Sequence, residues 1–318
     1  MAPAPAAPRY AYLGPEGTFT EQALRQATAG GDHAELVPVA SVDAALEAVR
    51  AGDVDAAMVP IENSVEGGVS ATLGALAQGD PLLVVGEQVV PVTFDFVVRP
   101  GLSREDVTRI ASHPHGLAQC RVWLHREFPK ATLVPALSTA GAAEGLLDPA
   151  TPWDAALCAP IAARRFGLAP MLTDVGDNTA AVTRFVLVSR PGPLPAPTGA
   201  DKTTLAAYLG PDDKPGQLLE LLEQFAVRGV NLSRLESRPT GEGMGRYYMS
   251  IDAEGHVAEA RVAEALKGLH RVCPKVIFLG SYPRAGGEPA PVRPETSDAA
   301  FTEADTWLRS IQNPLTPP

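Results

Sequence analysis

Residues 55–69 read DAAMVPIENSVEGGV and join an apolar run to a polar loop. The first part, 55–61, predicts a buried strand because it is short, apolar and followed by polar residues and glycines. Glu62, Asn63 and Ser64 place hydrogen-bonding side chains directly after that strand, and two glycines lead into a helix expected from Val69. Strand, polar loop and helix in this order form the repeating unit of an α/β fold.

The same alternation continues on both sides of this unit, over residues 9–190. Further strands are expected at 9–13, 82–86, 89–98, 131–135, 155–159 and 185–189. Helices are expected at 18–27, 41–52, 69–77, 117–126, 139–146 and 161–166, the first two with Thr18 and Ser41 as N-terminal caps. This part of the chain therefore predicts an α/β domain.

A second domain is expected after the proline-rich stretch PGPLPAPTGA at 191–200, which is typical of a spacer. Strands at 203–209, 232–238, 246–252 and 276–281 alternate with helices at 216–228 and 257–269. This βαββαβ order predicts a ferredoxin-like domain over 201–284, a type that often pairs with a second copy. The tail, 285–318, is rich in proline and carries one amphipathic patch around Phe301, Trp307, Leu308 and Ile311. We expect the tail to be mobile or weakly docked.

Composition excludes several classes of function. The chain has 318 residues, 45% of them hydrophobic, and 37 acidic against 26 basic side chains give a net charge of −11, which argues against nucleic acid as a partner. Three widely spaced cysteines fit a reducing compartment, and the sequence contains neither a membrane-spanning apolar run nor a secretory signal. We expect a soluble, cytoplasmic protein with no membrane partner. Nucleophile-elbow, Walker, Rossmann and HExxH motifs are absent from the sequence.

Polar residues gather in five loops where predicted strands and helices meet. In α/β proteins ligands bind beyond the carboxyl ends of strands, so these residues are candidates for a binding site. The groups are Thr18; Glu62, Asn63 and Ser64; Ser112, His113 and Gln119; Ser138 and Thr139; and Asn178 with Thr183, Arg184 and Phe185.

Each of these groups allows a simpler interpretation. The loop at 62–68 could be a solvated loop, although this interpretation is less favoured, and Ser138 with Thr139 could be only the cap of the next helix. Thr18 alone is explained as a helix cap. His113 and His115 suggest a metal, but no further ligand stands at a suitable spacing, so hydrogen-bond donation is preferred. Arg184 needs a negative partner, which could be Asp174 or Asp177 as a structural pair, or a bound anionic ligand.

The chain resembles monofunctional bacterial prephenate dehydratases over about residues 9–284. The similarity rests on YLGPEGTFTEQAL (12–24), VPIENSVEGGV (59–69), SHPHGLAQC (112–120), ALSTAGAA (136–143) and DNTAAVTRFVLV (177–188). Phe166, Leu168, Met171 and Asp177 fall at the spacing of the family's active-site signature. LSRLESRP (232–239) resembles the effector motif of an ACT-type regulatory domain. A chorismate mutase segment is not seen before Arg9, which favours the monofunctional type.

The resemblance implies a fold and a reaction. A catalytic domain at 9–190 would form two subdomains arranged as in a periplasmic binding protein, roughly 9–87 with 180–190, and 88–179. The activity implied is the decarboxylating dehydration of prephenate to phenylpyruvate, water and CO2 on the route to phenylalanine, without metal or organic cofactor. Alternatives are arogenate dehydratase, and a non-catalytic two-lobed protein that binds a small anion.

The resemblance also implies roles for the polar loops. Thr183 would donate a proton or a hydrogen bond to the departing C4 hydroxyl, and a dianionic substrate in an acidic domain needs focused hydrogen-bond donors. The expected catalytic set adds Arg184, Asn63, Ser64, Ser112 and Gln119 to Thr183. The expected substrate-binding residues are Thr18, Glu62, His113, Ser138, Thr139, Asn178 and Phe185.

The second domain is expected to bind L-phenylalanine as an allosteric effector between paired copies. Gly216 and Leu218 start a helix whose free amides can accept the effector's carboxylate, where the family usually reads Gly-Ala-Leu and this chain has Gln217. Asn231 and Glu236 are expected to reach the ammonium group and Leu218 with Leu232 the ring. Ser237 and Arg238 complete the effector set, and a homodimer or homotetramer is expected.

Overall fold

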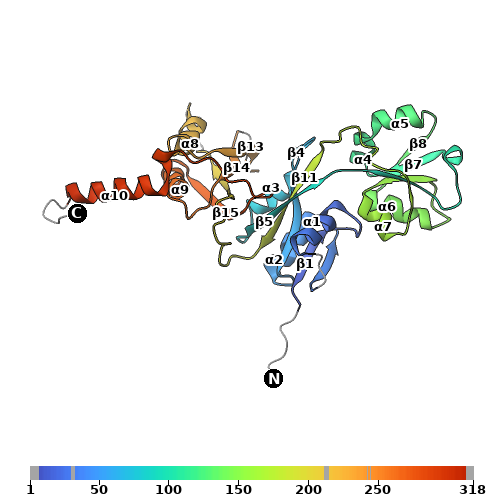
Figure 1. The fold of residues 1–318 in the computed structure, drawn as a ribbon, viewed down its shortest axis with the longest axis horizontal. Coiled ribbons are helices and arrows are strands. Elements are labelled where there is room, and N and C mark those ends of the chain that lie inside the picture. Colours follow the sequence, from blue (N-terminus) through green and yellow to red (C-terminus); the bar gives the residue numbers. More distant parts are fainter. Residues whose placement is uncertain (1–6, 30–32, 211–214, 242, 244, 313–318) are drawn as a thin grey trace, which may run out of the picture. The chain divides into compact units, whose positions relative to one another are not determined.

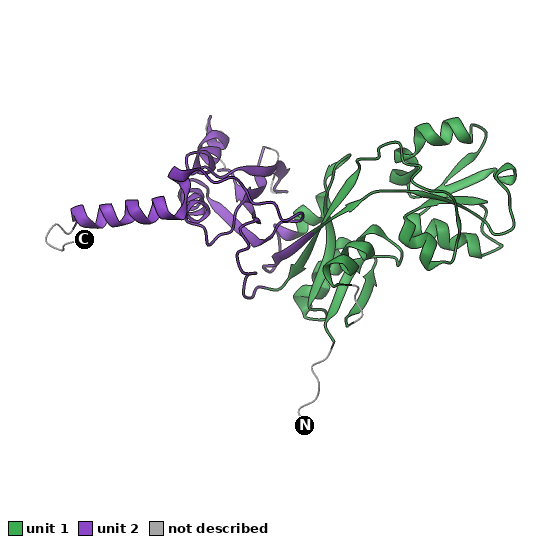
Figure 2. Cartoon of the chain, viewed as in Figure 1, with its two compact units in different colours: residues 1–75, 88–190 green, residues 76–87, 191–318 purple. Residues whose placement is uncertain are grey.

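The structure is a computed structural model that describes residues 7–29, 33–210, 215–241, 243 and 245–312. The chain divides into two compact units (Figure 2), residues 1–75 with 88–190, and residues 76–87 with 191–318. The first unit contains two mixed sheets and the second one antiparallel sheet. The fold class is α/β, as predicted.

The first sheet of the larger unit has the order β2-β1-β3-β11-β5. These strands span β1 (Arg9–Leu13), β2 (Glu35–Val39), β3 (Ala56–Asn63), β5 (Leu83–Pro91) and β11 (Val182–Ser189), with short β4 (Gly67–Gly68) beside β3. β1 runs parallel to β2 and β3, and β11 runs antiparallel to β3. The helices of this part are α1 (Phe19–Ala27), α2 (Val42–Ala51) and α3 (Ser70–Leu76).

The second sheet has the order β10-β6-β9-β7-β8. Its strands are β6 (Asp95–Val98), β7 (Arg109–Ser112), β8 (Thr132–Pro135), β9 (Ala155–Cys158) and β10 (Pro170–Leu172). Around it lie α4 (Pro114–Gln119), α5 (Arg121–Glu127), α6 (Thr139–Glu144), α7 (Pro160–Arg165) and the 3-10 turns η1 (Arg104–Asp106) and η2 (Gly145–Leu147). The chain passes between the sheets twice, from β5 to β6 and from β10 to β11. This is the two-subdomain arrangement expected of the catalytic domain.

The predicted helix caps are confirmed. Thr18 Oγ1 accepts the backbone N–H of Glu21 at 3.4 Å, and Ser41 Oγ accepts that of Ala44 at 3.1 Å. Gly52 ends α2 with a φ of +82°, in the left-handed region that glycine adopts without a steric cost.

The four-stranded sheet of the smaller unit has the order β13-β14-β12-β15, with every pair antiparallel. The elements follow as β12 (Asp201–Tyr208), α8 (Gln217–Ala226), β13 (Leu232–Pro239), β14 (Tyr247–Glu254), α9 (Ala260–Val272) and β15 (Lys275–Pro283). A core that includes Leu205, Leu221, Phe225, Ile251 and Leu269 joins α8 and α9 to one face of the sheet. The predicted ferredoxin-like βαββαβ order is confirmed (Figure 1).

Several elements differ from the sequence prediction. Residues 83–91 form one strand and 95–98 another in a different sheet, where two strands at 82–86 and 89–98 were expected. Strands β2, β7 and β10 were not predicted, since they are short and β2 and β10 include proline. The helix expected at 117–126 begins at Pro114 and is interrupted at Cys120, whose ψ of +15° is not helical.

The tail holds more regular structure than expected. After η3 (Pro294–Thr296), residues Asp298–Gln312 form the 15-residue helix α10. Among the residues that the structure describes, no helix is both long and apolar enough to span a membrane.

Candidate active site

The pairing of β3 with β11 joins two loops that lie far apart in the sequence. In the antiparallel register Thr183 lies opposite Asn63, and Arg184 opposite Glu62. The register shifts between Arg184 and Phe185, as a β-bulge would cause. Thr183 and Arg184 are buried at 9% and 6% exposure, and both lie at the end of the strand beside the loop that follows β3.

A fixed hydrogen bond orients the Thr183 hydroxyl. Asn63 Nδ2 donates to Thr183 Oγ1 at 2.8 Å, while Asn63 Oδ1 accepts the backbone N–H groups of Val65 at 2.8 Å and Glu66 at 3.2 Å. Because Oδ1 is held by two backbone donors, the amide cannot flip, and Nδ2 must face Thr183. The hydroxyl oxygen is therefore an acceptor toward Asn63, and its proton is directed to another partner.

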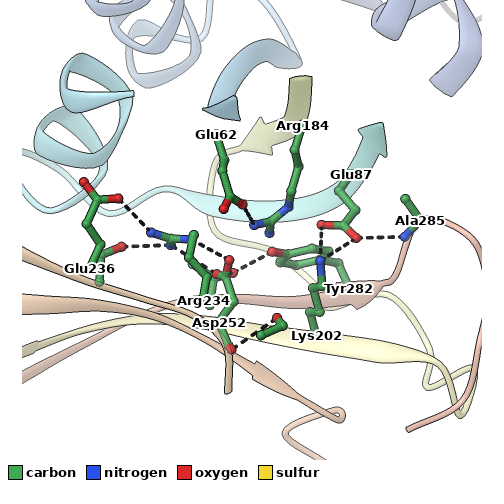
Figure 3. A network of polar contacts seen from close by, with 12 residues as sticks. Glu62, Glu87, Arg184, Lys202, Arg234, Glu236, Asp252, Tyr282 and Ala285 are labelled. Carbon is green, nitrogen blue, oxygen red and sulfur yellow. Dashed lines mark hydrogen bonds and ion pairs between the residues drawn. The ribbon is translucent and has the colours of Figure 1, made fainter. Parts of the chain in front are cut away.

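Arg184 contacts a carboxylate from the neighbouring strand. Its Nη1 lies 3.4 Å from Glu62 Oε2 (Figure 3). The Arg184 side chain is 7% exposed and that of Glu62 is 37% exposed. The sequence suggested Asp174 or Asp177 as a structural partner of Arg184. For Asp177 this suggestion is wrong. The Asp177 carboxylate accepts the N–H groups of Val122 and Trp123 at 2.8 and 2.9 Å, at the start of α5.

Ser64 closes the end of the β3–β11 pair. Its Oγ accepts the N–H of Val182 at 3.0 Å, and its own N–H donates to the Val182 carbonyl at 3.0 Å. Ser64 thereby holds Thr183 in register with Asn63.

Two residues expected at the site have packing or capping roles in this structure. Phe185 is 2% exposed and packs in the core with Tyr12, Leu24 and Met58. The bulge before it turns its side chain into the core. The expected role of Phe185 in substrate binding stays a prediction. Thr18 Oγ1 donates to the Leu13 carbonyl at 3.2 Å and accepts from Glu21, which matches the helix-cap interpretation.

The second sheet contributes the starts of two helices. Ser112 is fully buried and donates to the Leu157 carbonyl at 2.8 Å. Ser138 Oγ accepts the N–H of Gly141 at 2.8 Å and caps α6, whose first residue is Thr139. Gly116, in α4, leaves no room for a side chain, since a Cβ there would lie 2.7 Å from Ser112 Oγ. These close contacts fix the two helix starts beside each other.

The two histidines of this region make separate contacts. His113 Nδ1 accepts the N–H of His115 at 3.3 Å, and burial, more than the neighbouring His115, lowers the pKa of His113. His115 Nδ1 lies 3.1 Å from Glu66 Oε2, which joins α4 to the loop after β3. Within the described part of the chain, no three His, Cys, Asp or Glu side chains come together as a metal site would require.

A cavity of about 230 Å³ lies between the loop after β3 and the segment before β11. Its lining includes two predicted residues, Gln119 and Asn178, together with Glu66 and Phe94. Glu66 was not among the predicted site residues, although it belongs to the polar run that contains Asn63. The sequence did not indicate Phe94 as a site residue, because an aromatic residue beside a strand is normally interpreted as part of the core.

The effector residues are partly rearranged relative to expectation. Gly216 has a φ of +92° and precedes α8, and Leu218 is 40% exposed. Glu236 Oε1 accepts a hydrogen bond from Arg238 Nη1 at 3.1 Å, and Glu236 Oε2 lies 3.7 Å from Arg234 Nη1. Figure 3 shows Glu236 beside Arg234 and Asp252, on the sheet face that α8 does not cover.

Within one chain, Glu236 therefore lies on the sheet face away from the Gly216 helix start. Strand alternation places Ser237, opposite Met249, on the helix-covered face instead. Asn231 is exposed and accepts the N–H of Glu254 at 2.9 Å through its carbonyl, and Leu232 packs at the edge of the core.

Comparison with known proteins gives a consistent result. Residues 10–193 match the family model for prephenate dehydratase. A prephenate dehydratase of Amycolatopsis methanolica is 47% identical over 305 residues, which cover 96% of this chain and 98% of that protein. The crystal structure of prephenate dehydratase from Arthrobacter aurescens in complex with L-Phe aligns with a TM-score of 0.90 at 56% identity, covering 96% of this chain and 99% of the other.

One further solved structure, described as a novel type of quorum quenching acylase, aligns with a TM-score of 0.77 at 31% identity, covering 87% of this chain and 98% of that one. The family model covers more than half of the chain, and the Amycolatopsis and Arthrobacter proteins align over nearly the full length of both chains. The chain belongs to the prephenate dehydratase family.

Proposed function

We propose that this enzyme converts prephenate to phenylpyruvate, water and CO2 for L-phenylalanine synthesis, with Thr183 as hydrogen-bond donor to the leaving hydroxyl. The observation that supports this role is the Asn63–Thr183 hydrogen bond. Because the Thr183 oxygen accepts the hydrogen bond from Asn63, the Thr183 proton can be donated toward the substrate. The proposed domains are a catalytic domain at 9–190, a spacer at 191–200 and a regulatory domain at 201–284.

The chemistry requires little covalent assistance. When CO2 leaves, the electron pair of the broken carbon–carbon bond moves into the ring and expels the C4 hydroxyl, which needs a proton to depart as water. Formation of the aromatic ring drives the step. A threonine hydroxyl is a weak acid, so we propose that Thr183 stabilises the developing hydroxide by hydrogen bonding and that no cofactor takes part.

Charge complementarity supports a dianionic substrate. Arg184 is nearly buried beside Thr183 and already contacts a carboxylate, that of Glu62. We propose that a substrate carboxylate competes with Glu62 for this guanidinium, and that Gln119, Asn178, His113 and the α6 start at Ser138 supply neutral donors. Ser64 and Ser112 hold these elements in place.

Incubation of the purified full chain with prephenate tests the proposal directly. We expect phenylpyruvate to accumulate, measured by its absorbance, at a rate that exceeds spontaneous decay of the substrate. Arogenate, assayed in parallel for phenylalanine, distinguishes the alternative dehydratase. Faster turnover of arogenate would reassign the substrate, and no turnover of either would favour a binding protein.

Removal of the Thr183 hydroxyl should mainly affect turnover. We expect Thr183→Ala to lower kcat by about 10²–10⁴-fold with little change in KM, the usual contribution of a positioned proton or hydrogen-bond donor. Thr183→Ser is the matched control, because it keeps the hydroxyl and should retain most activity.

The orientation of that hydroxyl is tested at Asn63. Asn63→Asp replaces the Nδ2 donor with an acceptor, so Thr183 would turn its proton toward the carboxylate and away from substrate. We expect kcat to fall as in Thr183→Ala. Normal turnover in either Thr183→Ala or Asn63→Asp would contradict the proposed role.

Substitution of Arg184 should mainly affect substrate affinity. Arg184→Lys keeps the charge but loses the planar pair of donors, which are worth about 1.5–3 kcal/mol when they bind a charged group. We expect KM for prephenate to rise about 10- to 100-fold. Arg190→Lys is the control, because Arg190 donates to the carbonyls of Val49 and Val54 and has no proposed substrate contact. Equal KM values in the two variants would make Arg184 a structural residue.

We also propose feedback regulation by L-phenylalanine, bound near the Gly216 turn in the regulatory domain of an assembly of two or four copies in the cytoplasm. The phenylalanine complex of the Arthrobacter relative supports the ligand. Calorimetry on the full chain should detect phenylalanine binding, and saturating phenylalanine should change substrate affinity about 5- to 150-fold, with the reciprocal effect of substrate on phenylalanine.

A matched pair of glycine variants tests the proposed position of the effector site. Gly216 and Gly286 both have left-handed φ angles, +92° and +91°, and neither has another group within 4 Å of an added Cβ. Gly216→Ala should weaken phenylalanine binding while basal activity persists, and Gly286→Ala should not. Unchanged affinity in Gly216→Ala would place the effector elsewhere.

A further inference from the structure

The second half of helix α10 carries apolar side chains that are exposed in the described chain. None of its 15 residues is buried, and Trp307, Leu308 and Ile311 are 63%, 43% and 55% exposed. A helix of about 12–15 residues is only marginally stable alone in water, so most helices of this length depend on packing. The exposed stripe therefore points to a contact that one chain does not supply.

The start of α10 is fixed to the regulatory unit. Asp298 Oδ1 accepts the N–H of Ala260 at 2.8 Å, and the buried Thr296 packs so closely on Gly229 that a Cβ there would lie 2.9 Å from it. Phe301 is half-buried, and every residue after it is exposed. The helix leaves the unit from this attachment, as the red helix of Figure 1 shows.

The apolar residues of α10 follow a heptad pattern. Phe301, Ala304, Leu308 and Ile311 are spaced by three, four and three residues, the a and d positions of two successive heptads. Thr302, Thr306 and Ser310 lie away from this stripe. This spacing places the four apolar residues on one side of the helix, where they can pack against a second helix.

We propose that α10 pairs with α10 of a second copy of this chain, antiparallel and about a two-fold axis near residue 306. In this register Phe301 packs on the partner's Ile311, and the small Ala304 on the partner's Leu308, which keeps the layers similar in volume. A parallel pair would instead place Ala304 on the partner's Ala304 and leave a gap.

Charge and aromatic residues agree with the same register. Arg309 comes near the partner's Asp305 on one side of the pair, and Trp307 lies beside the partner's Trp307 on the other. A two-heptad contact is small against the 1,200–2,000 Å² or so that stable interfaces bury. The pair therefore adds to another contact between copies, and joins smaller assemblies into a larger one.

Cross-linking of the full chain tests the pairing and its direction. With 1.5 Å of rise per residue, the two copies of residue 304 are about 6 Å apart along the helix axis in the antiparallel pair, and those of residue 311 about 15 Å. A short thiol cross-linker should therefore join Ala304→Cys efficiently and Ile311→Cys poorly. The native cysteines are buried, and burial raises their pKa values, so the introduced thiol reacts first.

Thr306→Cys, on the outer face, controls for random collisions. Equal cross-linking of Ala304→Cys and Ile311→Cys would indicate a parallel pair and overturn the proposed register. Cross-linking of Ala304→Cys no stronger than that of Thr306→Cys would overturn the pairing itself. The apolar stripe would then pack against some other surface.

The mass of the assembly in solution gives an independent measurement. The double variant Leu308→Glu with Ile311→Glu should halve the mass measured by light scattering and leave the basal rate with prephenate unchanged. The double variant Thr302→Glu with Thr306→Glu adds the same charge to the opposite face and should keep the wild-type mass. An unchanged mass in the first variant, or an equal loss in both, would contradict the proposal.

Discussion

The antiparallel pairing of β3 with β11 is the constraint on which the site depends. It brings Asn63 and Thr183, 120 positions apart, into a 2.8 Å hydrogen bond, and the same register sets Glu62 against Arg184. The bulge after Arg184 then returns Phe185 to the core. One strand pair thus supplies the Thr183 hydroxyl, with a defined direction for its proton, and the Arg184 cation. The next residue of β11, Phe185, anchors the strand in the core.

A second constraint lies within the regulatory unit, which includes residues 76–87 from the first half of the chain. Strand β5 begins among residues that pack with the regulatory unit, and its second half belongs to the larger unit. Glu87 on this strand is buried and binds Lys202 Nζ at 3.0 Å, and it also accepts the N–H of Ala285 at 2.8 Å (Figure 3). Gly280 allows an equally close approach, since a Cβ there would lie 2.1 Å from the Val84 carbonyl oxygen. Because buried ion pairs and close backbone contacts tolerate little displacement, the first half of β5 is held firmly within the smaller unit.

The order of helices and strands was predictable because it depends on local sequence patterns. Apolar runs, the Thr18 and Ser41 caps, and the βαββαβ order after residue 200 depend on neighbours within a few residues. Short strands such as β7 and β10 were missed, since their stability comes from the strands beside them rather than from their own composition. Where α10 lies, the sequence predicted only a short amphipathic patch, because proline-rich segments flank this part of the chain.

The sequence alone determined the family, the fold class and most of the polar residues around the site, since these reside in contiguous motifs. Only the tertiary structure decided what each residue does. Asp177 caps α5 instead of holding Arg184, Phe185 packs in the core, and Glu236 lies on the sheet face away from α8. These assignments depend on strand register, on a bulge and on which face each side chain occupies. A one-residue change of register reverses the face of a side chain, and no local pattern specifies it.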